Sequence, residues 1–322
     1  VDTSRQSGAA VVDALLLGLY SVSLLLISLV GSRIPERFEM THTRAQLAMS
    51  LVSGLMLGIA MFHLLPHAVL TLGVEDGLNT VMAWVAVGLV TMLLLLRLFH
   101  FHQPDFPAVT EHVQESDRGH RHNHDHEQQS NALDTSHLHC ESHAPYVDRV
   151  VNWRGVLVGL SFHTLVDGVA LGAALLGAPH GHAEELLGFG VFLAILLHKP
   201  LDAMSISALM RSGGASLFSQ RLANVVFALL CPLGAVGFFL YASGDGSDAT
   251  LTIAAALAFS AGAFICIALS DLLPEVQFHS HDRGKLTAVF LFGIVLSFLL
   301  ANASSELDHR VPDAAATLEE PR

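Results

Sequence analysis

Eight stretches of this sequence are each apolar over about the 20 residues that a helix needs to cross a lipid bilayer. They cover about residues 11–32, 45–72, 80–101, 151–177, 184–210, 221–243, 249–275 and 285–303. Because the bilayer core offers no water to backbone groups, such segments form helices that satisfy their own hydrogen bonds. Only 14% of the residues are charged, against about a quarter in soluble domains. The sequence therefore predicts an all-α, polytopic membrane protein with a bundle of eight transmembrane helices, embedded in the inner or plasma membrane.

Basic residues occur in alternate connections between these segments, which predicts the orientation of the chain. The first, third, fifth and seventh connections carry Arg or Lys, whereas the second, fourth and sixth carry acids such as Glu75, Glu184 and Asp245. Under the positive-inside rule the odd-numbered connections face the cytoplasm. Both termini are therefore expected outside. The first segment lacks a basic leader and a small-residue cleavage site, so we interpret it as a spanning helix rather than a signal sequence.

A single long polar insertion divides the predicted helices into two groups. Residues 1–101 carry the first three helices, 102–149 the insertion, 150–305 the last five helices, and 306–322 a short extracytoplasmic tail. The insertion is expected to be cytoplasmic and disordered, and tracts rich in histidine bind metals. A solvated linker is the alternative, but metal buffering or sensing explains the composition better. Its candidate ligands are His120, His122, His124, His126, His137, His139, Cys140 and His143.

Two apolar segments each carry a histidine and an aspartate four residues apart. These pairs are His163 with Asp167 and His198 with Asp202. At 3.6 residues per turn, both members of a pair project from one face of a helix. Ionisable groups within a bilayer cost several kcal/mol unless they serve a partner or a path. Imidazole and carboxylate are common ligands of divalent transition metals, so the pairs predict a metal site inside the membrane.

The order of these motifs resembles the ZIP (Zrt/Irt-like) family of divalent-metal transporters. The resemblance rests on the segment from Ser161 to Gly172, which reads SFHTLVDGVALG, and on His198-Lys199-Pro200-Leu201-Asp202. Two further stretches, FHLLPH at 62–67 and ALSDLLPE at 268–275, also fit, as does the histidine-rich insertion between the third and fourth helices. The resemblance spans all eight segments. It implies an eight-helix transporter and not an enzyme.

The resemblance also implies roles for individual residues. His163, Asp167, His198 and Asp202 would bind the transported metal near the middle of the membrane, and Met56 would match a soft ligand of some relatives. Asp271 would match an acid on the cytoplasmic exit route, with Glu275 one turn further on. His63 and His67 share a face near the outer end of the second segment, where either packing or contact with the metal on its route fits.

A departure from the bacterial two-metal pattern of this family concerns the predicted number of ions. Where some relatives place an Asn and an acid as ligands of a second metal, this sequence has Thr164 and Lys199. An ammonium group beside His198 can occupy that space and neutralise part of the site's charge. We therefore expect a site for one metal with Lys199 as its counter-ion. The alternative is a lysine that extends its charged end to the membrane interface.

The expected function is transport of Zn²⁺, or another divalent metal such as Fe²⁺, Mn²⁺, Co²⁺ or Cd²⁺, into the cytoplasm. The metal ion and the lipid bilayer are the expected partners, a homodimer is left open, and no nucleic acid is expected. One alternative is an exporter of the cation diffusion facilitator type, which would have six helices and usually a soluble C-terminal domain. Another is an intramembrane zinc hydrolase. The sequence lacks HExxH and shows no separate general base near the pairs.

Overall fold

The computed structural model describes residues 2–33, 42–99, 153–177, 182–243, 247–278 and 283–309, and no strand occurs among them. A π-helical turn, η1 (Ala60–Leu64), joins α3 to α4. The α-helices are α1 (Asp2–Gly31), α3 (His42–Ile59), α4 (Leu65–Leu72), α5 (Val74–Phe99), α6 (Trp153–Leu176), α7 (His182–Ser212), α8 (Leu217–Ala242), α9 (Ser247–Phe278) and α10 (Arg283–His309). Because α3, η1 and α4 form one continuous span, the described chain has eight helical segments with the length and hydropathy of membrane spans. The predicted all-α fold is confirmed.

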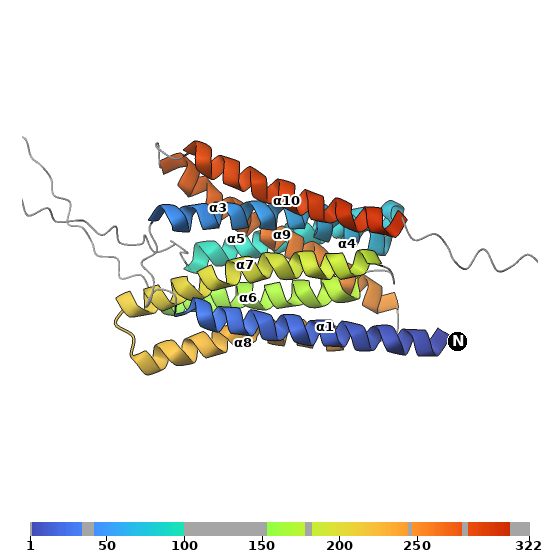
Figure 1. Cartoon of the computed structure of the whole chain (residues 1–322), viewed down its shortest axis with the longest axis horizontal. Helices are drawn as coiled ribbons and strands as arrows, with labels where there is room; N and C mark the ends of the chain where they lie inside the picture. Colours follow the sequence, from blue (N-terminus) through green and yellow to red (C-terminus); the bar gives the residue numbers. More distant parts are fainter. Residues whose placement is uncertain are drawn as a thin grey trace, which may run out of the picture.

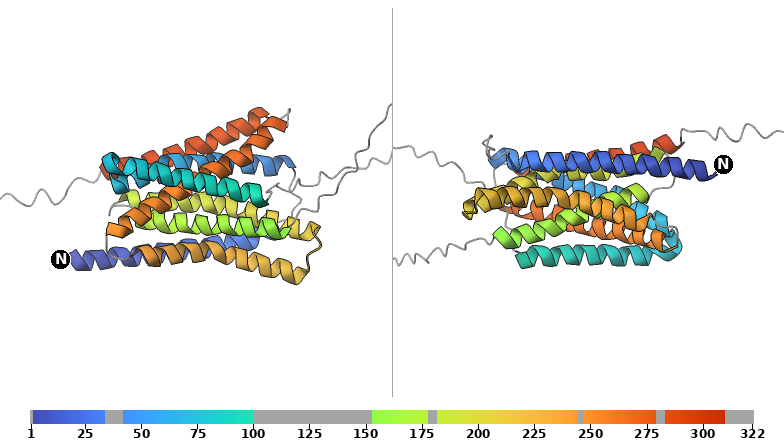
Figure 2. Two further views of the ribbon diagram at one scale, coloured as in Figure 1. Left: turned by 180° about the vertical axis from the view of Figure 1, so that it is seen from behind. Right: turned by 90° about the horizontal axis from the view of Figure 1, so that it is seen from below.

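The helices lie side by side along the long axis of the molecule (Figure 1). The start of α1 and the end of α10 lie at the same end of this bundle, and the turn from α7 to α8 lies at the opposite end (Figures 1 and 2). Helix α1 packs against α7 and α8, and α6 packs most extensively against α8. Helices from distant parts of the sequence therefore surround α6 and α7.

Helix α1 shows how the sequence divides each span into an inner and an outer face. Its large exposed apolar side chains recur at Leu15, Leu19, Val22 and Leu26, three or four residues apart. This spacing places them in one stripe on the helix. Leu17, Tyr20 and Leu24, which lie between them in the sequence, are buried. An exposed apolar stripe is the surface that lipid tails favour and water does not, as expected for a spanning helix.

Glycines set the closest approaches between helices. A Cβ atom added at Gly168 of α6 would overlap the backbone oxygen of Cys231 in α8, and one at Gly172 would lie 2.7 Å from the backbone oxygen of Ala235. Gly168 and Gly172 therefore allow α6 and α8 to approach each other closely. Similar close crossings join α3 to α10 and α5 to α9, through Gly54, Gly293, Gly88 and Gly262. Small residues allow such contacts between helices in membranes.

The π turn η1 was not predicted from the sequence. It ends eight residues before the end of a segment that we expected to be one uninterrupted helix, and Pro66 follows it in the first turn of α4. A π turn contains one residue more than an α-helical turn and often marks a functional position. Here it contains the buried His63.

Candidate metal site

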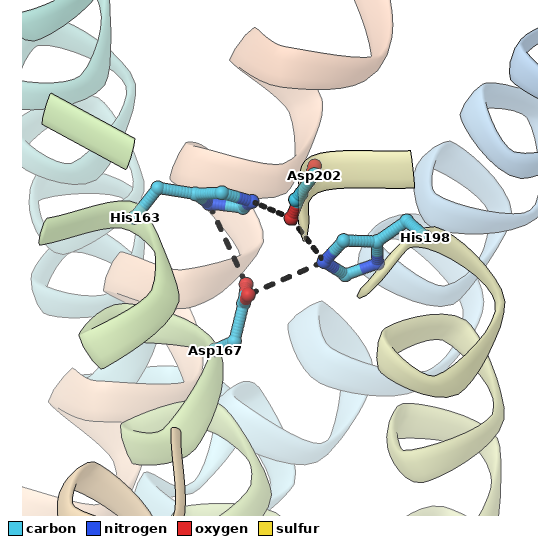
Figure 3. Close-up of side chains that lie close together, drawn as sticks. All are labelled: His163, Asp167, His198 and Asp202. Atoms are coloured by element: carbon cyan, nitrogen blue, oxygen red, sulfur yellow. Dashed lines mark hydrogen bonds and ion pairs between the residues drawn. The ribbon is translucent and has the colours of Figure 1, made fainter. Parts of the chain in front are cut away.

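The four side chains of the two predicted pairs meet between α6 and α7. His163 and Asp167 extend from α6, and His198 and Asp202 extend from α7, with all four pointing toward one another (Figure 3). One ligand atom from each residue lies within 4.8 Å of the others. Three of the four residues are buried and Asp202 is partly exposed. Two helical i,i+4 pairs thus produce one four-ligand cluster.

The distances within this cluster suit ligands around one ion better than direct ion pairs. His163 Nδ1 lies 3.5 Å from Asp167 Oδ1, and His163 Nε2 lies 3.7 Å from Asp202 Oδ2. His198 Nε2 lies 3.2 Å from Asp167 Oδ2 and 3.8 Å from Asp202 Oδ2. Bonds of about 2.1 Å to a tetrahedral zinc ion would separate its ligand atoms by about 3.4 Å. Direct charge-assisted hydrogen bonds are shorter, about 2.7–2.9 Å.

Three polar atoms of the cluster are buried without a hydrogen-bond partner. They are His163 Nδ1, Asp167 Oδ1 and Asp202 Oδ2. Buried polar atoms are normally paired, because leaving water without a new partner costs several kcal/mol for a charged group. A cation held by these atoms would provide the missing interaction. The donor set therefore fits a divalent metal.

The orientation of His198 is fixed by its own helix. Its Nδ1 lies 2.8 Å from the carbonyl oxygen of Ala194, to which it donates a hydrogen bond. The ring therefore presents Nε2 to the carboxylates of Asp167 and Asp202. Ligand histidines in metal sites commonly use their second nitrogen in this way, which fixes both the tautomer and the ring plane.

Lys199 is fully buried beside the cluster. Its Nζ donates to Thr164 Oγ1 at 2.8 Å and to Asp167 Oδ2 at 3.2 Å. The ring centroid of Phe227 in α8 lies 4.9 Å from the same Nζ, a cation–π distance. A lysine reaching to the membrane interface would expose its ammonium group, so that alternative is wrong. The ammonium group therefore pairs with Asp167 of the neighbouring helix α6.

A small cavity of about 40 Å³ adjoins the cluster. It is lined by the site residues His163, His198 and Asp202 together with Met56 of α3. Sequence reasoning did not single out Ser53 and Ser205, which also line it. Helical spacing could have indicated both serines, because Ser53 precedes Met56 by three residues and Ser205 follows Asp202 by three, which puts each serine on the same face as a predicted site residue. The packing of Phe227 against Lys199 had no such signal.

His63 and His67 do not join the cluster. His63 is 1% exposed, and its Nε2 donates to the carbonyl oxygen of Ser297 in α10 at 3.2 Å. His67 is partly buried in α4. Asp271 and Glu275 fall within α9, but their side chains lie outside the described residues. So does the whole histidine-rich insertion, with His120, His122, His124, His126, His137, His139, Cys140 and His143.

Comparison with known proteins connects this arrangement to one family. The family described as ZIP zinc transporter matches residues 8–301. Zinc transporter ZIP9 of Micropogonias undulatus is 28% identical over 321 residues, which cover 88% of this chain and 95% of that protein. Zinc transporter ZIP1 of Danio rerio is 25% identical over 295 residues, covering 84% and 91%. Zinc transporter ZIP9-B of Xenopus laevis is 31% identical over 156 residues, covering 47% of this chain and 50% of its own.

The family match covers nearly the whole chain and agrees with the eight apolar helices of the fold. Members of this family are transporters rather than enzymes, which confirms that part of the prediction. The chain belongs to the ZIP zinc transporter family and is a multi-pass integral membrane protein that transports divalent metal ions.

Proposed function

We propose that this protein carries Zn²⁺ into the cytoplasm through one metal site formed by His163, Asp167, His198 and Asp202. The main support is the convergence of four ligand atoms from α6 and α7 to within 4.8 Å of one another. Two imidazoles and two carboxylates form a donor set that suits Zn²⁺. The same set accepts Fe²⁺, Mn²⁺, Co²⁺ and Cd²⁺, because selectivity among these ions depends on geometry and availability.

Lys199 is the proposed counter-ion of this site. The two carboxylates carry two negative charges when ionised, and the ammonium group 3.2 Å from Asp167 offsets one of them. A net charge of minus one holds a divalent ion less tightly than minus two, which favours release after binding. The Lys199 ammonium donates a hydrogen bond of 2.8 Å to the Thr164 hydroxyl, and both residues stand at positions where some relatives place ligands of a second metal. We therefore infer that one metal binds at a time.

The remaining predicted residues would contact the ion before and after this site. Met56 lines the same small cavity as His163 and Asp202, which supports its thioether as an additional soft contact. His63 and His67 would serve the outer half of the route, and Asp271 and Glu275 the inner half. This direction rests on the positive-inside orientation, in which the shared end of α1 and α10 faces outside. The histidine-rich insertion would buffer or sense metal on the cytoplasmic side.

Uptake of ⁶⁵Zn²⁺ by purified protein in sealed vesicles tests both the site and the direction. Alanine replacement of His163, Asp167, His198 or Asp202 should each remove most uptake, because each removes one of four ligands. His309→Ala at the end of α10 is the matched histidine control and should transport normally. Normal uptake by two of the four site variants would contradict the assigned site. Competition with Fe²⁺, Mn²⁺, Co²⁺ and Cd²⁺ in the same assay would rank the substrates.

A further inference from the structure

A second, larger cavity is lined by residues from the end of α1, the end of α7 and the first half of α8. The end of α1 and the turn from α7 to α8 lie at the end of the bundle opposite the N-terminus (Figure 1). Its volume is about 590 Å³, within the range of sites for small molecules. Arg33, just after α1, Arg211 in α7 and Arg221 in α8 all line it. No acidic residue lines the cavity within the described part of the chain. Three guanidinium groups from three separate elements thus share one space.

The inner wall of this cavity is polar. Ser207 is 2% exposed and is hydrogen-bonded to Asn224, whose Nδ2 donates to the serine Oγ at 3.0 Å. Ser32 and Gln220 are also buried there. Buried hydroxyl and amide groups beside arginines can donate hydrogen bonds to an anion. The same positive charge disfavours entry of a metal cation, so this cavity is not part of the proposed metal route.

Helix electrostatics account for two of the arginines but not for the third. Arg33 and Arg211 lie at the C-terminal ends of α1 and α7, where the helix dipole favours cations. Arg221 lies near the N-terminal end of α8, where the dipole favours anions instead. The positive-inside rule explains basic residues at this end of the bundle, but not their assembly around one cavity. An anion between the arginines and the start of α8 would stabilise all of these groups.

The walls of the cavity indicate what kind of anion it would hold. Leu217 and Val225 of α8 line it and are 67% and 46% exposed. Phe218, Leu222 and Val226 continue this exposed apolar surface along the same helix. A ligand with a charged head and apolar tails would match both the basic cavity and its apolar border. Inorganic phosphate would use only the basic part.

We propose that this cavity binds the phosphate headgroup of an anionic phospholipid, with the acyl chains lying along the outer face of α8. The three guanidinium groups contact the phosphate, and the polar inner wall contacts the rest of the headgroup. Basic pockets between spanning helices are a general means of recognising anionic lipids. This site is separate from the His/Asp cluster, so the proposal does not depend on the identity of the transported metal.

Native mass spectrometry of the delipidated full-length protein tests the proposal with phosphatidylglycerol and phosphatidylcholine as probes. Phosphatidylglycerol should bind at least about tenfold more tightly, because each cation near an anionic lipid contributes about a fivefold gain. The variant Arg33→Gln/Arg211→Gln/Arg221→Gln should lose this preference. Arg221→Gln alone should lose about fivefold. It should remain folded, because it removes a cation from the unfavourable end of a helix dipole.

The matched control is Arg44→Gln/Arg97→Gln/Arg283→Gln, which removes the same charge from exposed positions at the same end of the bundle. It should keep its lipid preference within about twofold. Equal losses in both triple variants would show general attraction to basic residues and overturn the proposal. Full competition by millimolar inorganic phosphate would overturn the lipid assignment. The proposal would also be overturned if the folded wild-type protein showed no preference for phosphatidylglycerol. This holds even if acidic side chains of the same chain were the reason, because they would then take the place of the lipid phosphate.

Discussion

Two buried histidines, His198 and His63, are held by similar hydrogen bonds, but only His198 has carboxylates beside it. Each donates one ring nitrogen to a backbone carbonyl, His198 to Ala194 of its own helix and His63 to Ser297 of α10. The other nitrogen of His198 faces two carboxylates. Beside the ring of His63 lies Gly190 of α7, and no carboxylate contact to His63 is found among the described residues. A fixed histidine therefore becomes a strong candidate metal ligand only where negative charge is built around it.

The largest expected effect on uptake comes from removing a carboxylate that faces His198. Asp167→Asn should lower Zn²⁺ uptake at least about a hundredfold, because it removes a ligand and leaves the buried Lys199 ammonium without its carboxylate. Breaking one half of such a pair also destabilises the fold by about 3–5 kcal/mol. Uptake per folded molecule and thermal stability should therefore both be measured.

The double variant Asp167→Asn/Lys199→Met separates these two effects. It removes both charges of the pair, so stability should recover toward that of the wild type. Uptake should stay low because the ligand is still missing. If uptake recovered together with stability, Asp167 would be a structural residue and not a ligand.

The next largest effect concerns how tightly the cluster around His198 binds Zn²⁺ and how many ions it holds. Lys199→Ala should tighten Zn²⁺ binding by about tenfold or more, because it removes repulsion between an ammonium group and the ion. It should not create a second site. Lys199→Glu/Thr164→Asn should admit a second ion, since oxygen donors replace the cation. Anomalous diffraction at the zinc edge counts the ions, and two peaks between α6 and α7 in the unmodified protein would contradict the counter-ion role.

A smaller effect on uptake is expected from replacing His63. His63→Ala should lower uptake only severalfold, because its surroundings provide no carboxylate charge for the metal. Loss of its hydrogen bond to Ser297 should destabilise the protein by about 1–2 kcal/mol. Ser297→Ala is a matched control, since it changes the side chain but keeps the carbonyl that accepts this bond. A loss as large as that of His198→Ala would place His63 among the main ligands.

The smallest effect on uptake is expected from changes in the histidine-rich insertion, far in the sequence from both His198 and His63. Deletion of residues 119–143 removes the histidine-rich part of the insertion and touches none of the described helices. Uptake should stay close to the wild-type level, while the amount of additional metal bound to the protein should fall. Metal content after dialysis measures the second quantity. Complete loss of uptake in a correctly inserted deletion protein would make the insertion part of the route.

The sequence predicted the fold well because each span needs only length and hydropathy. All eight segments form helices, although α1 begins nearer the N-terminus than expected. The four-residue spacing of His163 with Asp167 and of His198 with Asp202 also predicted which side chains share a face. That the two faces would meet depended on the resemblance to a known family. Periodicity within one helix does not specify the neighbour of that helix.

Other features of the site depend on contacts between helices and could not be predicted from local spacing. Lys199 was expected to be the counter-ion of the site, but its partners Asp167 and Thr164 lie across the interface and spacing within its own helix does not indicate them. The stacking of Lys199 on Phe227 requires α8 to lie beside α7, which no motif indicated. The π turn at Ala60–Leu64 likewise has no clear local signal, because the same residues suit an α-helix.

The π turn also gives this span one place where a change of chain length is tolerated. Because η1 holds one residue more than an α-helical turn, deleting a single residue from Ala60–Leu64 would allow one regular helix to form. Side chains after the deletion, such as His67, would then keep about the same direction relative to α3. The same deletion within α3 would instead rotate every later side chain by about 100° relative to the residues before it.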